Sequence, residues 1–285
     1  VADQRARGIA KTAVHFCCGL FLSAASLAHR CQPFAMGLLC AVTGVQAAVL
    51  ALGAGAGYLL FWGEAGYQGL LWLGLALPVA LILGRRQIIH ESVFLMSSIA
   101  ALIVSASGLF FQIFRGDTTP VGVYLLRIVA GAVSARLFYL VRLRQDVVAD
   151  WIAEGIAVLA LAQVVPFPGF SLGYVAAGVL TAAGALPAVA LAGLALDLAQ
   201  VTATPMTGIL CLAYLCRTLP YGRKWIPYAA PAAVYILVMN LGGFSDFLPA
   251  VGLAIGGAGA VFLPPKPELR HRRGETGLAQ VRLEL

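Results

Sequence analysis

Stretches of membrane length without a charged residue dominate this sequence, and the stretch from Pro33 to Trp62 shows most clearly what the chain can fold into. Over the whole chain 61% of the residues are hydrophobic and 11% are charged, whereas an ordinary soluble domain has about 25% charged residues. A core in water could not cover so much apolar surface, but uncharged runs of this length match the hydrocarbon thickness of a bilayer. The sequence therefore predicts an all-α polytopic membrane protein.

The spacing of the apolar runs predicts about ten to twelve helical segments within a transmembrane domain that covers residues 1–263. After a basic leader, the predicted segments in the first half are Thr12–Ala28, Pro33–Trp62, Gly69–Gly84, Val93–Phe114 and Val121–Val141. In the second half they are Trp151–Val165, Ser171–Ala183, Pro187–Ala199, Pro205–Arg217, Trp225–Asn240 and Phe247–Leu263.

Basic residues are retained on the cytoplasmic side of a membrane, so their positions orient the chain. With the N-terminus inside, the inner loops hold Arg85, Arg86, Arg142, Arg144, Arg217, Arg223 and Lys224, and the outer loops hold little beyond Arg30 and Arg115. This asymmetry requires a break within Pro33–Trp62, near Thr43–Gln46. A single helix there would also be about 45 Å long, too long for a hydrocarbon core of about 30 Å. Both termini are therefore expected in the cytoplasm.

Gly169–Ala199 has the same pattern as Pro33–Trp62: a short apolar segment, a break of small residues and a second apolar segment. Phe34 aligns with Phe170 and Gly37 with Gly173. We interpret this as a weak internal repeat with halves 33–141 and 169–263. The halves start an even number of crossings apart, which predicts a parallel repeat. The first segment of each pair is short, so each pair could span the membrane or form a re-entrant hairpin.

Glycines mark both broken segments: Gly37, Gly44, Gly53, Gly57, Gly173 and Gly184. Two interpretations are open. Re-entrant backbone at membrane depth would line a cavity or be buried at the centre of the bundle. Alternatively, the small-x-x-x-small spacing of Gly53 and Gly57 lets two helix backbones pack closely.

Four charged residues fall within predicted helices, where a charge is costly and often functional. Arg136 and Glu154 lie near the inner ends of consecutive helices and could form an ion pair. Arg127 and Asp197 lie near outer ends and could pair between the halves. These pairs would be either structural contacts near the membrane interfaces or part of a transport pathway.

The sequence has no phosphate loop, no H-E-x-x-H, no G-x-S-x-G and no paired acidic loop that would hold a metal. The net charge of +7 is concentrated on the inner loops and tail, which predicts attraction to anionic lipid at the inner face rather than to nucleic acid.

The tail, residues 264–285, is expected to leave the membrane into the cytoplasm. It carries a basic patch of Arg270, Arg272 and Arg273. Leu278, Val281 and Leu285 follow the spacing of one helix face, which predicts the start of an amphipathic linker helix.

The order of parts along the chain resembles a known family. A basic leader and first helix precede a P-F-x-x-G segment, Pro33-Phe34-Ala35-Met36-Gly37, and a G-Y-L-L segment, Gly57-Tyr58-Leu59-Leu60. Many helices follow, and then an exit motif, Gly274-Glu275-Thr276-Gly277, with Ala279-Gln280-Val281-Arg282-Leu283-Glu284. Over nearly its whole length the chain resembles the multi-spanning N-terminal region of stage II sporulation protein E, the membrane-bound phosphatase of endospore-forming bacteria.

This resemblance implies a cytoplasmic linker that supports self-association and contact with the tubulin-like division protein FtsZ. It also implies a following manganese-dependent PPM-type serine/threonine phosphatase domain, which releases the first forespore-specific sigma factor. None of that domain's metal-binding motifs is present in this sequence. The expectation is a non-catalytic membrane domain without a cofactor of its own, homo-oligomeric, in the bacterial cell membrane at the polar septum. The alternative is a secondary transporter or membrane small-molecule sensor that uses the two broken segments.

Overall fold

The computed structural model describes residues 2–27, 32–83, 93–115, 120–144, 146–218, 225–243 and 246–263, and most of these residues are in helices with no β-strand among them. The protein is therefore an all-α helical membrane protein, as its composition predicts. The basic patch at 270–273, the predicted linker-helix face and the exit motif all lie outside the described residues.

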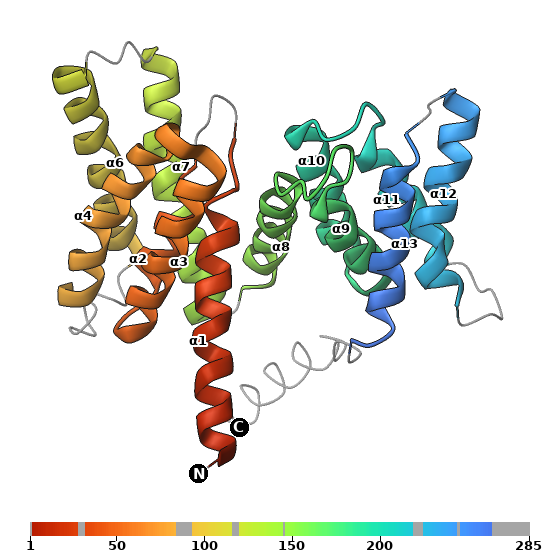
Figure 1. The fold of residues 1–285 in the computed structure, drawn as a ribbon, viewed down its shortest axis with the longest axis horizontal. Coiled ribbons are helices and arrows are strands. Elements are labelled where there is room, and N and C mark those ends of the chain that lie inside the picture. The colour runs from red at the N-terminus through yellow and green to blue at the C-terminus, as the bar shows by residue number, and fades with distance from the viewer. Residues whose placement is uncertain are drawn as a thin grey trace, which may run out of the picture.

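The helices form two groups, one from each half of the chain (Figure 1). The first half contains α1 (Ala2–Leu22), α2 (Phe34–Ala41), α3 (Val45–Trp62), the short 3-10 helix η2 (Gly63–Gly66), α4 (Tyr67–Leu83), α6 (Val93–Arg115), α7 (Val121–Tyr139) and a π-helical turn, η3 (Leu140–Arg144). The second half contains α8 (Val147–Ala162), α9 (Leu172–Ala183), α10 (Leu186–Ala199), α11 (Met206–Thr218), α12 (Ile226–Gly242) and α13 (Leu248–Ala260).

The predicted break in the first apolar stretch is confirmed, because α2 ends at Ala41 and α3 begins at Val45. Gly44 precedes α3 with a φ of 66°, a left-handed conformation that glycine adopts without steric cost. The glycine therefore lets the chain reverse direction between the two helices.

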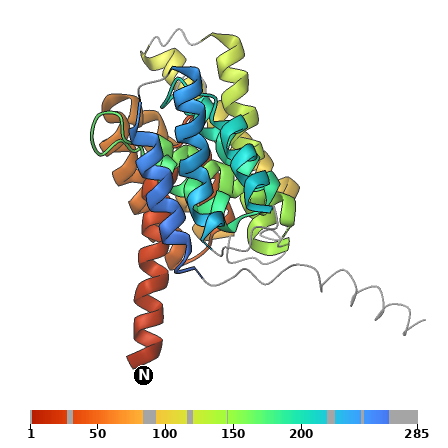
Figure 2. The same cartoon turned by 90° about the vertical axis from the view of Figure 1, so that its right-hand side faces the viewer.

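The first helix is longer than the apolar run that predicted it. It begins at Ala2 instead of Thr12, because the polar leader continues the same helix beyond the apolar part. This end of α1 extends below the other helices (Figures 1 and 2). The side chains of residues 8–14 are exposed there, and the buried part of α1 begins only near Gly19.

Three described stretches are long and apolar enough to cross a membrane by length and composition, namely Val45–Ile82, Leu95–Phe114 and Val121–Arg142. The first of these contains α3, η2 and α4. The helices of the second half are apolar but shorter. Aromatic residues lie at both ends of the bundle, with Trp62 and Tyr67 at one end. Trp151 and Trp225 lie at the starts of α8 and α12. Such residues are typical of the two membrane interfaces.

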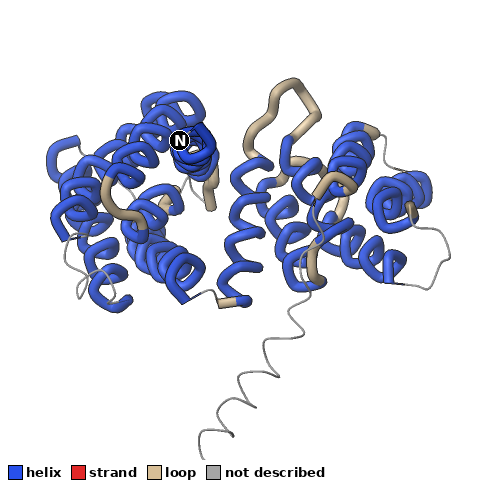
Figure 3. Tube along the Cα trace, turned by 90° about the horizontal axis from the view of Figure 1, so that it is seen from below, coloured by secondary structure: helices blue, strands red, loops and turns tan. Residues whose placement is uncertain are grey.

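The two halves reuse one packing scheme. In the first half α1 packs on α3, α2 on α7, and α6 on α7. In the second half α8 packs on α10, α9 on α13, and α12 on α13. Counted over the α-helices that the structure describes, each half therefore pairs its first helix with its third, its second with its sixth, and its fifth with its sixth. Seen from below, the halves form two neighbouring groups of helices (Figure 3).

The repeat is parallel and includes α1 and α8, which the sequence comparison placed before its start. Gly19 of α1 lies against Leu50 and Ala54 of α3, and Gly155 of α8 lies against Leu191 of α10. The ends of α1, α8 and α10 also meet at one cavity, lined among others by Ser26, Gln163 and Gln200. Because α1 and α8 end at the same face, these two helices run in the same direction.

Buried aromatic side chains join loops to helices in both halves. The hydroxyl of Tyr58 donates to the Gln32 carbonyl over 2.7 Å, and that of Tyr174 donates to the Val201 carbonyl over 2.8 Å. Tyr235 donates in the same way to Asp246 over 3.0 Å. A buried hydroxyl without a partner is destabilising. These bonds satisfy the hydroxyls and fix the loops that precede α2, follow α10 and precede α13.

Candidate functional site

Asp197 uses its carboxylate to hold the start of the next helix. One carboxylate oxygen accepts a hydrogen bond from the Met206 backbone N–H over 2.7 Å. The other accepts from the Thr207 backbone N–H over 3.1 Å and from its hydroxyl over 2.6 Å. Met206 and Thr207 open α11, and the first N–H groups of a helix have no partner within it. Asp197 therefore caps α11 from the end of α10, with a charge that matches the helix dipole.

For the predicted pair of Arg127 and Asp197, the structure shows other partners for the carboxylate. The Asp197 carboxylate is engaged by α11, while Arg127 lies on α7 in the other half of the molecule. Arg136 lies in the last turn of α7, where its side chain is exposed. Arg127 and Glu154 each have another interaction.

Two arginines that the sequence analysis assigned only to inner loops bind the ends of the short helices. Arg142 donates to the Ala41 carbonyl at the end of α2. Arg217 donates to the carbonyls of Thr181 and Gly184 at the end of α9, both over 3.0 Å, and lies over the Tyr214 ring. A guanidinium is favourable at a helix C-terminus, where carbonyls lack partners and the dipole is negative. Each half thus stabilises the end of its short second helix with an arginine from another helix.

Glycines bring the helix backbones together at the crossings. A Cβ at Gly53 would overlap the Phe16 carbonyl of α1, and a Cβ at Gly57 would overlap Ser23 and the Leu20 carbonyl. In the second half, Gly178 of α9 and Gly256 of α13 leave no room for a side chain between their helices.

The other predicted core glycines also lie at close contacts or breaks. Gly37 lies against Ser134 of α7, and Gly173 lies against Ala162 of α8. Gly184 ends α9, where it accepts the bond from Arg217. Gly53 and Gly57 lie at the kind of close backbone approach that small-x-x-x-small spacing permits.

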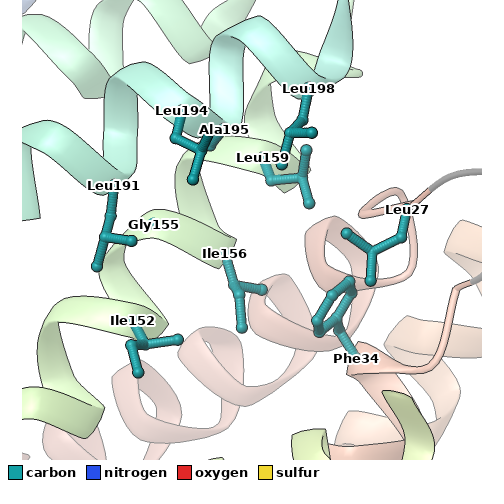
Figure 4. A pocket seen from close by; sticks show the side chains of 10 residues that line it. All are labelled: Leu27, Phe34, Ile152, Gly155, Ile156, Leu159, Leu191, Leu194, Ala195 and Leu198. Atoms are coloured by element: carbon teal, nitrogen blue, oxygen red, sulfur yellow. The ribbon is translucent and has the colours of Figure 1, made fainter. Parts of the chain in front are cut away.

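A groove lies between the two halves. Its upper part is a cavity of about 540 Å³, lined by Ser26, Leu27, Ala162, Gln163, Val165, Asp197, Leu198, Ala199, Gln200 and Val201. Its lower part, of about 130 Å³, is lined by Leu27, Phe34, Ile152, Gly155, Ile156, Leu159, Leu191, Leu194, Ala195 and Leu198 (Figure 4). Leu27 and Leu198 border both parts.

Sequence reasoning missed this groove, apart from Asp197, because it forms only where α1 and α2 of one half approach α8 and α10 of the other. Gln163 joins the halves directly, since its side-chain N–H donates to the Ser26 carbonyl over 3.0 Å. The available signal was the pair of glutamines, Gln163 and Gln200, at the ends of two mostly apolar segments.

No group of three or more His, Cys, Asp or Glu residues that could hold a metal occurs among the described residues. Comparisons with protein-family models, with curated proteins and with solved structures gave no match for this chain.

Proposed function

We propose that this chain is the membrane anchoring and assembly domain of a sporulation PPM-type serine/threonine phosphatase. In this role it would hold the phosphatase at the polar septum during asymmetric division, so that the forespore sigma factor is activated there. The order of sequence segments and the exit motif Gly274–Gly277 motivate the proposal.

The hydrogen bonding of the Asp197 carboxylate is the observation that favours this proposal over a transport function. In a transport pathway an intramembrane carboxylate has to be available to a substrate or ion. Here both of its oxygens are bound to the start of α11. Arg142 and Arg217 likewise bind helix ends. Polar groups that hold helices together suit a domain whose role is to anchor and assemble.

The expected partners follow from the same proposal. Anionic lipid at the inner face would attract the basic loops, and further copies of the chain would form a homo-oligomer. FtsZ and other division proteins would bind the cytoplasmic continuation. Manganese would belong to the phosphatase domain alone.

The test is expression of a fluorescently tagged copy of residues 1–285 in a sporulating endospore-forming bacterium. We expect fluorescence at the polar septum and an oligomer after mild detergent extraction. A tag carried on α1 alone, residues 1–27, is the control for membrane insertion without assembly. Even distribution around the membrane together with a monomeric extract would contradict the proposal.

A secondary transporter or small-molecule sensor is the second candidate, and the parallel repeat with two broken segments favours it. Its requirement is a solute that crosses or binds at the groove between the halves. Uptake into vesicles that contain the purified chain would support this candidate, provided that an Asp197→Asn variant that still elutes as a folded, monodisperse protein lost the uptake.

A further inference from the structure

The loop that joins α8 to α9 presents an apolar tip, residues Val165–Gly169. All of these residues are exposed, and the side chains of Val165 and Phe167 are each about half exposed. No charged residue occurs in the sequence between Glu154 and Asp197. Exposed apolar residues grouped in this way are typical of a surface that contacts a membrane or a partner.

The loop holds this tip in one shape. The rings of Phe167 and Phe170 stack with centroids 4.8 Å apart. The Phe170 backbone N–H donates to the Phe167 carbonyl over 3.1 Å, and the Leu172 N–H donates to the Val164 carbonyl over 3.1 Å. Gly169 has a φ of 82°, which lets the chain turn without steric cost. The apolar side chains therefore stay exposed on an ordered turn.

The backbone of the tip suits surroundings that are poor in water. Pro166 and Pro168 have no N–H group, so two positions of the tip have no backbone donor to satisfy. A backbone donor without a partner is costly in a bilayer, and irregular backbone does not occur where the hydrocarbon surrounds it. These two constraints together favour the boundary between headgroups and hydrocarbon over the hydrocarbon core itself.

The length of α8 brings the tip to this boundary. The helix begins after its cap, Asp146, at the predicted inner face and has 16 residues, so it is about 24 Å long. The hydrocarbon core of a bilayer is about 30 Å thick. The helices α7 and α12 extend further than α8 toward the other face, and in Figure 2 the green loop after α8 projects from the side of the bundle (Figures 1 and 2). The chain thus reaches the tip without leaving the level of the membrane.

We infer that the tip, Val165–Gly169, inserts into the headgroup boundary of the leaflet at this face, with Val165 and Phe167 against the upper ends of the acyl chains. Its apolar surface continues onto α10, because Val165 and Leu198 border the same cavity and Leu194 and Leu198 are exposed. Lipid is the occupant because it surrounds the bundle at this level. The contact is independent of whether the chain anchors a phosphatase.

The test uses the full chain, residues 1–285, in bilayers of phosphatidylethanolamine and phosphatidylglycerol, with a fluorescent amino acid introduced at Phe167 by amber suppression. Phospholipids brominated on their acyl chains quench a fluorophore in the membrane, and iodide quenches one in water. The same probe at Val133, on an exposed face of α7, is the control for a side chain that faces lipid. The probe at Ala65, beside Glu64 on the exposed turn η2, is the control for a charged turn at the same face.

We expect the ratio of bromolipid quenching to iodide quenching at position 167 to be close to that at position 133. It should be at least about threefold higher than at position 65, because aromatic side chains partition into the membrane interface. Val165→Asp puts a carboxylate on the tip and should lower the ratio at position 167. Leu241→Asp, the same kind of change at the exposed end of α12, should leave that ratio unchanged.

A ratio at position 167 equal to that at position 65 would overturn the inference, because the tip would then lie in water. Protection from both quenchers would also overturn it, because protein, such as a second copy of the chain, would then cover the tip. A ratio that Val165→Asp leaves unchanged would count against it in the same way. If Val165→Asp does not elute as a monodisperse protein, Pro166→Asp, at the next exposed position of the tip, replaces it.

Discussion

At the residue scale, the polar side chains inside this bundle act on helix ends. The Asp197 carboxylate accepts hydrogen bonds from the start of α11, and the Arg217 guanidinium donates hydrogen bonds to the end of α9. The sequence identified Asp197 as a costly charge but assigned it the wrong kind of partner, because the donors are backbone N–H groups. Such donors are invisible to an analysis that pairs opposite charges.

Removal of the Asp197 cap is expected to destabilise the protein. Asp197→Ala leaves three donors at the start of α11 without their acceptor, and a lost cap costs about 0.5–2 kcal/mol. The melting temperature of Asp197→Ala in detergent should fall. The melting temperature of Asp197→Asn should fall less, because asparagine keeps one acceptor oxygen. Glu64→Ala, which removes an exposed carboxylate from η2, should leave the temperature unchanged. An unchanged melting temperature for Asp197→Ala would show that the cap contributes nothing.

A second prediction concerns the close crossing of α1 and α3 and its tolerance of a larger side chain. Gly57→Leu places a side chain against Ser23 and the Leu20 carbonyl, and overpacking costs about 1–3 kcal/mol. The yield of monodisperse protein in size-exclusion chromatography after heating should drop sharply. Gly74→Leu is the matched control, since nothing lies within 4 Å of a Cβ built there. Equal yields for the two variants would argue against glycine-dependent packing.

At the element scale, the short helices α2 and α9 depend on other helices for their ends. With few residues each, they form little internal hydrogen bonding, so tertiary contacts stabilise them. Arg142 and Arg217 supply such contacts from the parts of the chain that follow α7 and end α11. The broken segments are therefore stable parts of the packed bundle.

Arg217→Met is expected to loosen the end of α9. It removes two hydrogen bonds from a charged donor to the Thr181 and Gly184 carbonyls, and bonds to charged groups contribute about 1.5–3 kcal/mol each. Hydrogen–deuterium exchange across α9 should accelerate, and Arg217→Lys should restore part of the protection. Arg136→Met makes the same change of charge at an exposed position and should have no effect on α9. Equal exchange in all three variants would contradict the role given to Arg217.

At the scale of the whole molecule, two parallel halves meet at a groove formed by α1 and α2 on one side and by α8 and α10 on the other. Gln163 crosses the boundary with one hydrogen bond. The ends of α1, α3, α8 and α10 lie at one face, opposite to the N-terminus in Figure 1. The positive-inside pattern predicts that this face is the outer one.

A fusion scan checks this orientation. Alkaline phosphatase, which is active only outside the cytoplasm, should be active when fused after Ala65 or after Pro168. It should be inactive when fused after Asp146, and a green fluorescent protein at that site should fluoresce. The reverse pattern would invert the topology, and activity at all three sites would show that the intervening helices do not cross.

The sequence by itself determined which segments are helical and where the first apolar stretch breaks. Uncharged runs, Gly44 and the arginine positions are local signals of membrane depth and chain reversal. It also indicated the repeat, through Phe34 on Phe170 and Gly37 on Gly173. Only the tertiary structure decided what the polar residues contact, because Asp197, Arg142 and Arg217 find partners on helices whose packing no local pattern encodes. The groove was likewise decided only by the tertiary structure, since Phe34 and Leu198 become neighbours only when the two halves pack.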